Sequence, residues 1–223
     1  MTRNQLVIVG VAVLAVVLAA VGYFVFFPNS SDAVPANSGG PGYTVAGDDH
    51  TMGSPKAPVV IIEYAAPTCP HCAHFDEDVF PQIKQNYIDT GKVFYVFRVF
   101  PLHPSDGAAE AMARCLPKDN YFEFIDLLFR NQREWDWEYQ VGDIHGGLVK
   151  MGRIAGMSAD QVDKCIADKA VAEHINKVAQ DGQARYNITG TPTFVINGAV
   201  HSSIDVGTWE DMRAVVEPLL AKK

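Results

Sequence analysis

Two cysteines separated by two residues are the part of this sequence best suited to chemistry. Cys69 and Cys72 flank Pro70 and His71, directly after the apolar run of residues 59–64 and directly before an amphipathic helical pattern. The pair is therefore predicted at a strand-to-helix junction, with Cys69 at the helix N-terminus. Free backbone N–H groups and the positive end of the helix dipole favour a thiolate there, and the thiolate is the form that attacks a disulfide.

The two residues between the cysteines fit the same chemistry. Pro70 suits the first helical turn, where its missing N–H is not needed, and a protonated His71 would add a positive group beside Cys69. Cys72 is close enough to close a small disulfide ring with Cys69 or to resolve a mixed disulfide formed by it. The four residues together predict a redox-active dithiol.

The same C-x-x-C spacing occurs in zinc sites and in short structural disulfides. The remaining cysteines, Cys115 and Cys165, are 50 positions apart and form no second C-x-x-C pair, so a four-cysteine zinc site is not expected. A mononuclear site completed by His71 and His74 is one alternative, and a purely structural disulfide within the pair is another. Redox chemistry is the favoured interpretation, and it requires no metal and no cofactor.

The N-terminal segment predicts export. Leu6 to Phe27 are 22 consecutive uncharged, mostly apolar residues. At about 1.5 Å per residue, a helix of this length crosses a hydrocarbon core of roughly 30 Å. Arg3 precedes the run and polar residues follow it, so the positive-inside tendency places the body of the protein outside the cytoplasm. An uncleaved transmembrane anchor at residues 1–27 is favoured over a cleaved signal segment.

Composition argues against nucleic-acid binding. The 223 residues carry a formal net charge of −8 and contain no basic stripe, so a phosphate backbone would be repelled. Residues 28–42 are rich in Ser, Asn, Gly and Pro and are expected to form a flexible tether. The tether leaves no room for a separate dimerisation domain.

The rest of the chain contains strand signals separated by helical ones. Strands are predicted at residues 43–45, 59–64, 93–100, 193–196 and 199–201, the last two joined by an Asn-Gly hairpin turn. Helices are predicted from residue 72 to Gly91 with a kink at Pro81, then at residues 107–115, 121–129, 144–154, from a capping box at Ser158, and at 170–186 and 208–221. About eighty helical residues therefore interrupt a sheet.

Three features then occur together: Cys69-Pro70-His71-Cys72 after a strand, Gly190-Thr191-Pro192-Thr193 leading into a hairpin, and an all-helical segment between them. In this combination the chain resembles the DsbA-like branch of the thioredoxin superfamily over roughly residues 54–220. The resemblance implies an α/β thioredoxin-like fold with an inserted all-helical domain, preceded by an N-terminal transmembrane helix. The expected division is an anchor or signal segment at 1–27, a tether at 28–42, a thioredoxin-like domain at 43–102 and 184–223, and a helical insertion at 103–183.

The resemblance also implies roles for individual residues. Cys69 looks like the exposed nucleophile of the family, and Cys72 looks like its buried resolving partner. Pro192 matches the proline that follows a cis peptide bond opposite the dithiol, and Thr191 matches the residue whose backbone pairs with an extended substrate. An ordinary trans proline at the start of an edge strand is the alternative.

Three further residues receive expectations in the same way. Glu63 stands six positions before Cys69, where relatives carry a partly buried acid that relays a proton to the resolving thiol. An acid that reaches solvent or pairs with a cation such as Lys92 or Arg98 is the alternative. Cys115 and Cys165 are expected to form a structural disulfide in the insertion, as in some DsbA-like proteins, against the alternative of two separate buried thiols.

The function implied by the resemblance is that of an exported, DsbA-like dithiol oxidase. It would introduce disulfide bonds into unfolded or newly exported proteins and pass the electrons to a membrane redox partner. The expected location is the periplasm or another extracytoplasmic space, with residues 6–27 in the inner membrane, or soluble there if a signal is cleaved. A disulfide reductase or isomerase on the same fold is one alternative. A non-catalytic peptide-binding chaperone or metal carrier is another.

Overall fold

The computed structural model describes Gly40 and residues 42–221 of the chain. The predicted anchor at Leu6 to Phe27 and nearly all of the tether lie outside the described residues. Among the helices that are described, none combines the length and the apolar character needed to cross a bilayer.

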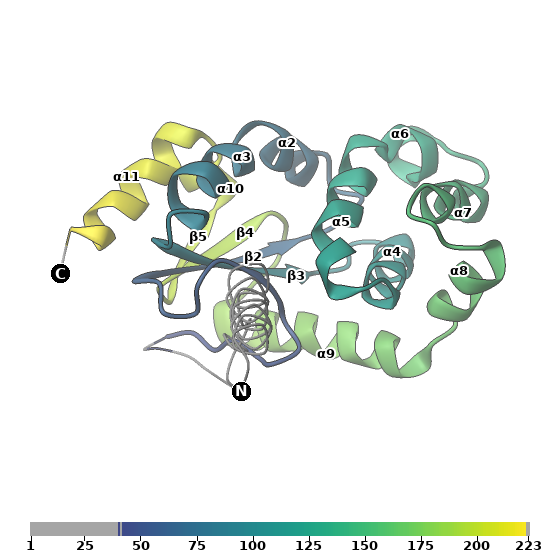
Figure 1. The fold of residues 1–223 in the computed structure, drawn as a ribbon, viewed down its shortest axis with the longest axis horizontal. Coiled ribbons are helices and arrows are strands. Elements are labelled where there is room, and N and C mark those ends of the chain that lie inside the picture. The colour runs from purple at the N-terminus through teal and green to yellow at the C-terminus, as the bar shows by residue number, and fades with distance from the viewer. Residues whose placement is uncertain (1–39, 41, 222–223) are drawn as a thin grey trace, which may run out of the picture. The chain divides into compact units, whose positions relative to one another are not determined.

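The described chain forms a five-stranded sheet with helices on both faces (Figure 1). The strands are β1 His50–Met52, β2 Val59–Ala65, β3 Val93–Val99, β4 Thr193–Ile196 and β5 Ala199–Ser202. The α-helices are α2 Pro70–Asp78, α3 Phe80–Ile83, α4 Pro104–Cys115, α5 Tyr121–Arg130, α6 Gln132–Trp135, α7 Ile144–Ile154, α8 Ala159–Ile166, α9 Lys169–Tyr186, α10 Ser203–Val206 and α11 Trp209–Leu220. A π-helical turn at Lys84–Ile88 follows α3, and short 3₁₀ turns lie at Lys118–Asn120 and Trp137–Tyr139.

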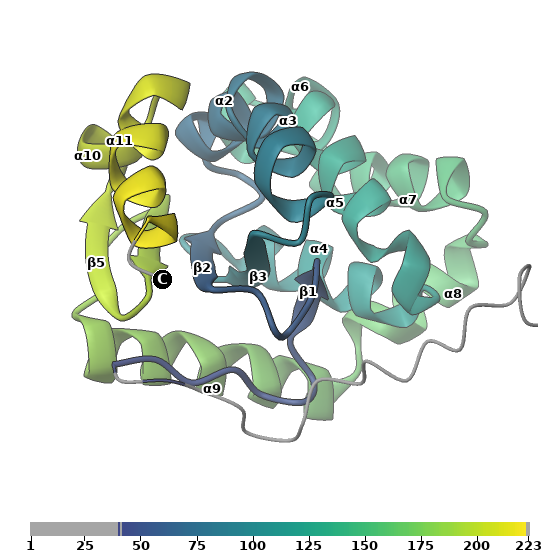
Figure 2. The same cartoon turned by 60° about the vertical axis from the view of Figure 1, so that its left-hand side comes forward.

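Strand β2 lies at the centre of the sheet, whose order is β1-β3-β2-β4-β5 (Figure 2). It pairs in parallel with β3, with Val59 opposite Val93, and antiparallel with β4. Strands β1 and β5 pair antiparallel with β3 and β4 at the two edges. The predicted parallel pair is therefore confirmed, and every residue of β2 is buried, as expected for a strand covered on both faces.

Alternate residues of β2 belong to two different hydrophobic clusters. Ile61 packs in a cluster with Phe75 of α2 and Met212 of α11, whereas Ile62 packs in a cluster with Tyr186 of α9. Figures 1 and 2 show α9 along one face of the sheet and α2, α3 and α11 on the other. The dithiol helix α2 thus shares its face of the sheet with the C-terminal helix.

The predicted edge strand at residues 43–45 is wrong in position. Only Val45 makes an isolated bridge, and the edge strand is β1. The reason lies in Arg98 of β3, whose guanidinium donates to the Thr44 carbonyl at 2.8 Å and to the Asp49 carboxylate at 2.7 Å. The Thr44 carbonyl is thereby bonded by a side chain and not by a neighbouring strand, and the regular strand begins at His50.

The helix that follows the two cysteines is interrupted, as predicted, at a proline. Pro81 lacks the N–H that would bond the Glu77 carbonyl, and α2 ends at Asp78 before α3 starts at Phe80. The π-helical turn that follows ends at Ile88, and Gly91, with φ of 72°, lies in the turn that leads into β3.

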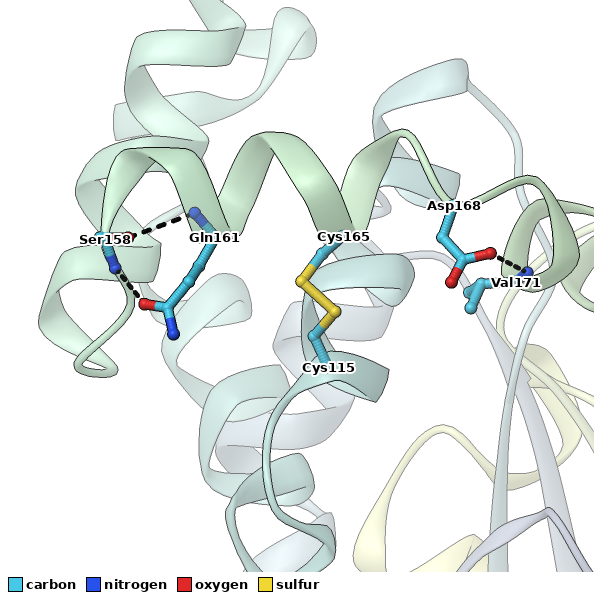
Figure 3. The surroundings of a disulfide bond; sticks show 6 residues. All are labelled: Cys115, Ser158, Gln161, Cys165, Asp168 and Val171. Atoms are coloured by element: carbon cyan, nitrogen blue, oxygen red, sulfur yellow. Dashed lines mark hydrogen bonds between the residues drawn. A yellow bond between two sulfur atoms is a disulfide. The ribbon is translucent and has the colours of Figure 1, made fainter.

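The helical insertion between β3 and β4 follows the predicted elements closely, and it contains the expected disulfide. Cys115 at the end of α4 is bonded to Cys165 in α8 (Figure 3). The predicted capping box is also present: the Ser158 hydroxyl accepts from the Gln161 N–H, and the Gln161 side chain accepts from the Ser158 N–H. Both devices fix the start and the packing of α8.

Candidate active site

Cys69 is the N-cap of α2, and Pro70, His71 and Cys72 form the first residues of this helix. The Cys69 sulfur accepts the backbone N–H of Cys72 at 3.3 Å, while Pro70 occupies the first helical turn. Neither cysteine is bonded, so the structure shows the dithiol form. The Cys69 side chain was expected to be exposed, but Cys69 is only 6% exposed, against 0% for Cys72. His71 is exposed.

A loop 122 residues away in sequence covers the nucleophile. The Thr191–Pro192 peptide bond is cis, and the Thr191 carbonyl oxygen lies 3.5 Å from the Cys69 sulfur. Pro192 is buried. The trans alternative is therefore wrong, and the proximity of this loop explains why so little of the Cys69 side chain is accessible.

The pKa of Cys69 is lowered from its usual 9.0 to about 6. The largest cause is a hydrogen bond from the Cys72 side chain, and burial acts in the opposite direction. The Thr191 side chain and the backbone N–H groups of Cys72 and His71 lower the pKa further. The His71 N–H acts at the helix start, as the helix N-terminus argument requires, and the charge expected of a protonated His71 ring is not among these causes.

The lowered pKa makes the stability of the dithiol form depend on pH. Because the thiolate is favoured in the folded protein, its stabilisation is complete above the usual pKa of 9.0 and is lost as the pH falls through about 6. We therefore expect an ultraviolet thiolate titration of the reduced protein to show a midpoint near pH 6. The stability gap between reduced and oxidised protein should shrink as the pH is lowered from 7 to 5. A midpoint close to 9 would contradict the geometry described for Cys69.

Glu63 and Cys72 form the buried side of the dithiol. Glu63 is 2% exposed, and its carboxylate accepts the Tyr95 hydroxyl at 2.5 Å. Burial raises the pKa of Glu63 to about 8, against the Tyr95 hydrogen bond, and the charges of Asp76 and Cys69 raise it further. Burial raises the pKa of Cys72 well above its usual value, with Cys69 and Glu63 adding to the effect.

The alternatives considered for Glu63 are wrong. Glu63 is buried, and within the described part of the chain it pairs with no cation: Arg98 pairs with Asp49 at 2.7 Å, and Lys92 lies over the Tyr87 ring. Its carboxyl group is enclosed beside the dithiol, where it can hold a proton at neutral pH.

Two polar side chains of the insertion hold the backbone around Cys69, and neither was predicted from the sequence. Buried Gln132 of α6 donates to the carbonyls of Pro67 at 2.9 Å and Cys69 at 3.1 Å. Buried Asp106 of α4 accepts the Thr68 N–H at 2.8 Å and the Thr68 hydroxyl. The signal for Asp106 is only its place in a helix-capping pattern, and Gln132 has no sequence signal at all.

Replacing Gln132 by leucine should destabilise the protein by about 1–3 kcal/mol, because it leaves the Pro67 carbonyl buried without its partner. Urea unfolding measures this change. The matched control is Gln180→Leu on the exposed face of α9, which should change the unfolding free energy by less than about 0.5 kcal/mol. Equal, small effects of both substitutions would show that the Gln132 hydrogen bonds do not hold the loop.

The histidines near the dithiol have local partners. His74 lies 2.7 Å from Asp78 in the same helix, and His103 caps α4 and stacks on Trp137. Within the part of the chain that the structure describes, no three His, Cys, Asp or Glu side chains are grouped so that they could hold a metal ion.

The sequence of this chain is similar to those of proteins named as disulfide oxidoreductases. The family model described as "Thioredoxin" matches residues 45–218. A Rickettsia bellii protein named "Putative protein-disulfide oxidoreductase" is 32% identical over 152 residues, which are 68% of this chain and 58% of that protein. A Bacillus cereus protein named "Probable disulfide bond formation protein D" is 29% identical over 153 residues, covering 66% of this chain and 69% of that protein. The chain thus spans a little over half the length of the Rickettsia relative.

Solved structures give the same result. The crystal structure of Wolbachia pipientis alpha-DsbA1 is 31% identical in sequence and superposes with a TM-score of 0.71. The match covers 78% of this chain and 92% of the Wolbachia chain. With the family model matching most of the described residues, this chain belongs to the DsbA-like branch of the thioredoxin superfamily.

Proposed function

We propose that the protein is an exported thiol-disulfide oxidoreductase that donates its Cys69–Cys72 disulfide to other proteins. One observation carries the proposal. Cys69 lies at the start of α2 with a pKa of about 6, while its partner Cys72 has a raised pKa and no access to solvent. The two thiols are therefore chemically unequal, as a directional exchange reaction requires.

The first step is attack on the oxidised protein. A substrate thiolate attacks the Cys69 sulfur and breaks the Cys69–Cys72 bond, which gives a mixed disulfide between the substrate and Cys69. Cys72 leaves as a thiolate and takes up a proton, because its raised pKa disfavours the charge. Glu63, buried beside it with a pKa of about 8, is the proposed proton donor.

The second step releases the product. A second substrate thiolate attacks the substrate sulfur of the mixed disulfide, so the substrate gains its disulfide and Cys69 leaves with the electron pair. A leaving thiolate with a low pKa departs faster, so the lowered pKa of Cys69 favours transfer of the disulfide away from the protein. The Thr191 backbone, next to the Cys69 sulfur, is the proposed partner for an extended substrate.

The same proposal includes a partner and a location. Each cycle leaves the dithiol form, so an electron-accepting membrane protein must restore the disulfide. The apolar segment at residues 6–27 supports export and tethering at the inner membrane, facing the periplasm. A soluble periplasmic protein results if that segment is cleaved. The names of the relatives, which refer to disulfide oxidoreductases and disulfide bond formation, support the activity.

A trapping experiment tests the proposed exchange. In Cys72→Ser the Cys69 thiolate can still attack a disulfide of an oxidised client protein, which forms a mixed disulfide and frees one client thiol. These mixed disulfides should accumulate, because the Cys72 thiol that would displace the client from Cys69 is missing. Non-reducing electrophoresis should show these complexes, and they should disappear on reduction. The double variant Cys69→Ser/Cys72→Ser is the control and should form none. Complexes that persist in the double variant would place the reactive sulfur elsewhere.

A further inference from the structure

A cavity of about 270 Å³ is lined by Tyr95, whose hydroxyl donates to the buried Glu63 carboxylate. Its walls include the rings of Phe80 and Phe122, which lie 4.8 and 6.3 Å from the Tyr95 ring between their centroids. Asp76 of α2 lines the same cavity. Tyr95 therefore has two neighbours of different kinds: it bonds Glu63 on one side and faces the cavity on the other.

The chemistry of the dithiol requires a proton path to this place. Cys72 must gain a proton when the disulfide is reduced and lose one when it is restored, yet Cys72 is 0% exposed and Glu63 only 2%. The opening at Cys69 is covered by the loop containing Thr191, and a bound substrate would close it further. A path through the cavity lined by Tyr95 and Asp76 would still let protons exchange with solvent during the mixed-disulfide step.

Asp76 is suited to the outer end of such a path. One of its carboxyl oxygens, Oδ2, is buried and has no hydrogen-bond partner among the described residues. Its charge acts on both Glu63 and Tyr95. Burial raises the pKa of Asp76, and the nearby Asp126 carboxylate raises it further, so Asp76 can carry a proton near neutral pH.

On the basis of the proposed function, we propose that Tyr95 is a positioning and proton-relay residue that connects Glu63 to Asp76 and the solvent of this cavity. As Cys72 leaves, Glu63 gives it a proton. Tyr95 passes its hydroxyl proton to the Glu63 carboxylate and receives one from Asp76 or from water. One proton moves from solvent to Cys72, no electrons move along the path, and the steps reverse when the disulfide is restored.

The groups that face this path come from several elements. Glu63 is influenced by Tyr95 of β3 and by Asp76 and Cys69 at α2. The charged groups that act on Asp76 are Asp126 and Arg130 of α5 and Glu77 of α2. Glu123 of α5 and Lys84 of the π-helical turn line the same cavity. In an assay that starts from the Cys69–Cys72 disulfide, Cys69 has no thiol to titrate, but the ionisation of the attacking small dithiol contributes to every profile. The relay is therefore identified from the difference between the wild-type and variant profiles.

Tyr95→Phe tests the relay because it keeps the ring and removes the hydroxyl. The measurement is the rate at which a small dithiol reduces the Cys69–Cys72 disulfide, followed from pH 5 to 10. In the wild type, the component due to Glu63 should have a midpoint near pH 8. Losing a hydrogen bond to the carboxylate raises its pKa, so this midpoint should move up by about one pH unit or more in the variant. The solvent deuterium isotope effect should change with it.

Two further variants keep the test decisive. Asp76→Asn, which cannot carry the proton, should slow reduction at pH 7 about threefold or more. Tyr87→Phe is the matched control, since that hydroxyl bonds Glu217 away from the dithiol, and it should leave rate and profile unchanged. The relay would be overturned if both Tyr95→Phe and Asp76→Asn showed the pH profile of the reduction rate and the isotope effect of the wild type. If Tyr95→Phe fails to fold, a wild-type pH profile in Asp76→Asn is enough to overturn it. The assay needs no protein client, so failure of the proposed oxidase activity would be seen separately.

Discussion

Cys69→Ser should abolish disulfide transfer to a reduced, unfolded protein, lowering the rate to that of the uncatalysed reaction. A serine oxygen cannot form the disulfide with Cys72, and it cannot leave as a thiolate from the mixed disulfide. The loss should appear as a failure of the variant to restore activity to a reduced client enzyme whose folding depends on disulfides.

The control for this prediction is the pair of cysteines outside the motif. Replacing Cys115 and Cys165 by alanine should leave the rate of disulfide transfer close to that of the wild type, because their disulfide lies between α4 and α8. A peptide-binding chaperone or a metal carrier that does not use the dithiol would keep its function in Cys69→Ser. Retained function in that variant would therefore exclude the oxidoreductase.

The same double replacement, Cys115→Ala/Cys165→Ala, should have the largest effect on stability. The disulfide closes a loop with a sequence separation of 50 residues. In the chain-entropy model, opening such a loop releases about 4 kcal/mol of denatured-state freedom. Denaturant unfolding under non-oxidising, non-reducing conditions should show a fall of this size. The slope of the transition should become steeper, because the unfolded chain without the disulfide is less compact and exposes more surface.

A single replacement separates the effect of the disulfide on the unfolded chain from the effect of lost side-chain packing. Cys115→Ala alone also breaks the bond but leaves Cys165 in its buried position, so the single and double variants should lose nearly the same stability. A loss below about 1 kcal/mol in both would show that the disulfide does not constrain the unfolded chain as the entropy model requires.

Local patterns were enough to predict the elements that carry the dithiol. Strands β2 and β3 are nearly continuous apolar runs, and α7 begins and ends at the predicted residues 144 and 154. The break before Pro81 and the capping box at Ser158 follow from the chemistry of single residues. Such signals act over one or two helical turns, so they are visible in the sequence.

The parts of the site that escaped prediction depend on contacts between distant segments. Gln132 reaches carbonyls 63 and 65 residues away, and Tyr95 reaches Glu63 across 32 residues. The charge of His71 was expected to lower the pKa of Cys69, whereas the hydrogen bond from the Cys72 side chain has the largest effect on it. No local pattern specifies these partners, because the fold creates them.

Pro192 could be placed from the family resemblance, whereas strand β1 could not be placed by any sequence signal. Its cis bond opposite Cys69 was expected from the family motif and not from local physics, since the two residues are far apart in the chain. The short strand β1, with the mixed residues His-Thr-Met, had neither a motif nor a clear alternation and was missed.

Equilibration of the purified protein with defined mixtures of reduced and oxidised glutathione at pH 7 measures the reduction potential of the Cys69–Cys72 pair. The stabilised Cys69 thiolate favours the dithiol form, so the potential should be strongly oxidising, between about −180 and −120 mV. As the pH rises through about 6, the slope of the potential with pH should become less steep, because reduction then takes up one proton instead of two. A potential near the −270 mV or so of thioredoxin would contradict a disulfide donor and indicate a reductase.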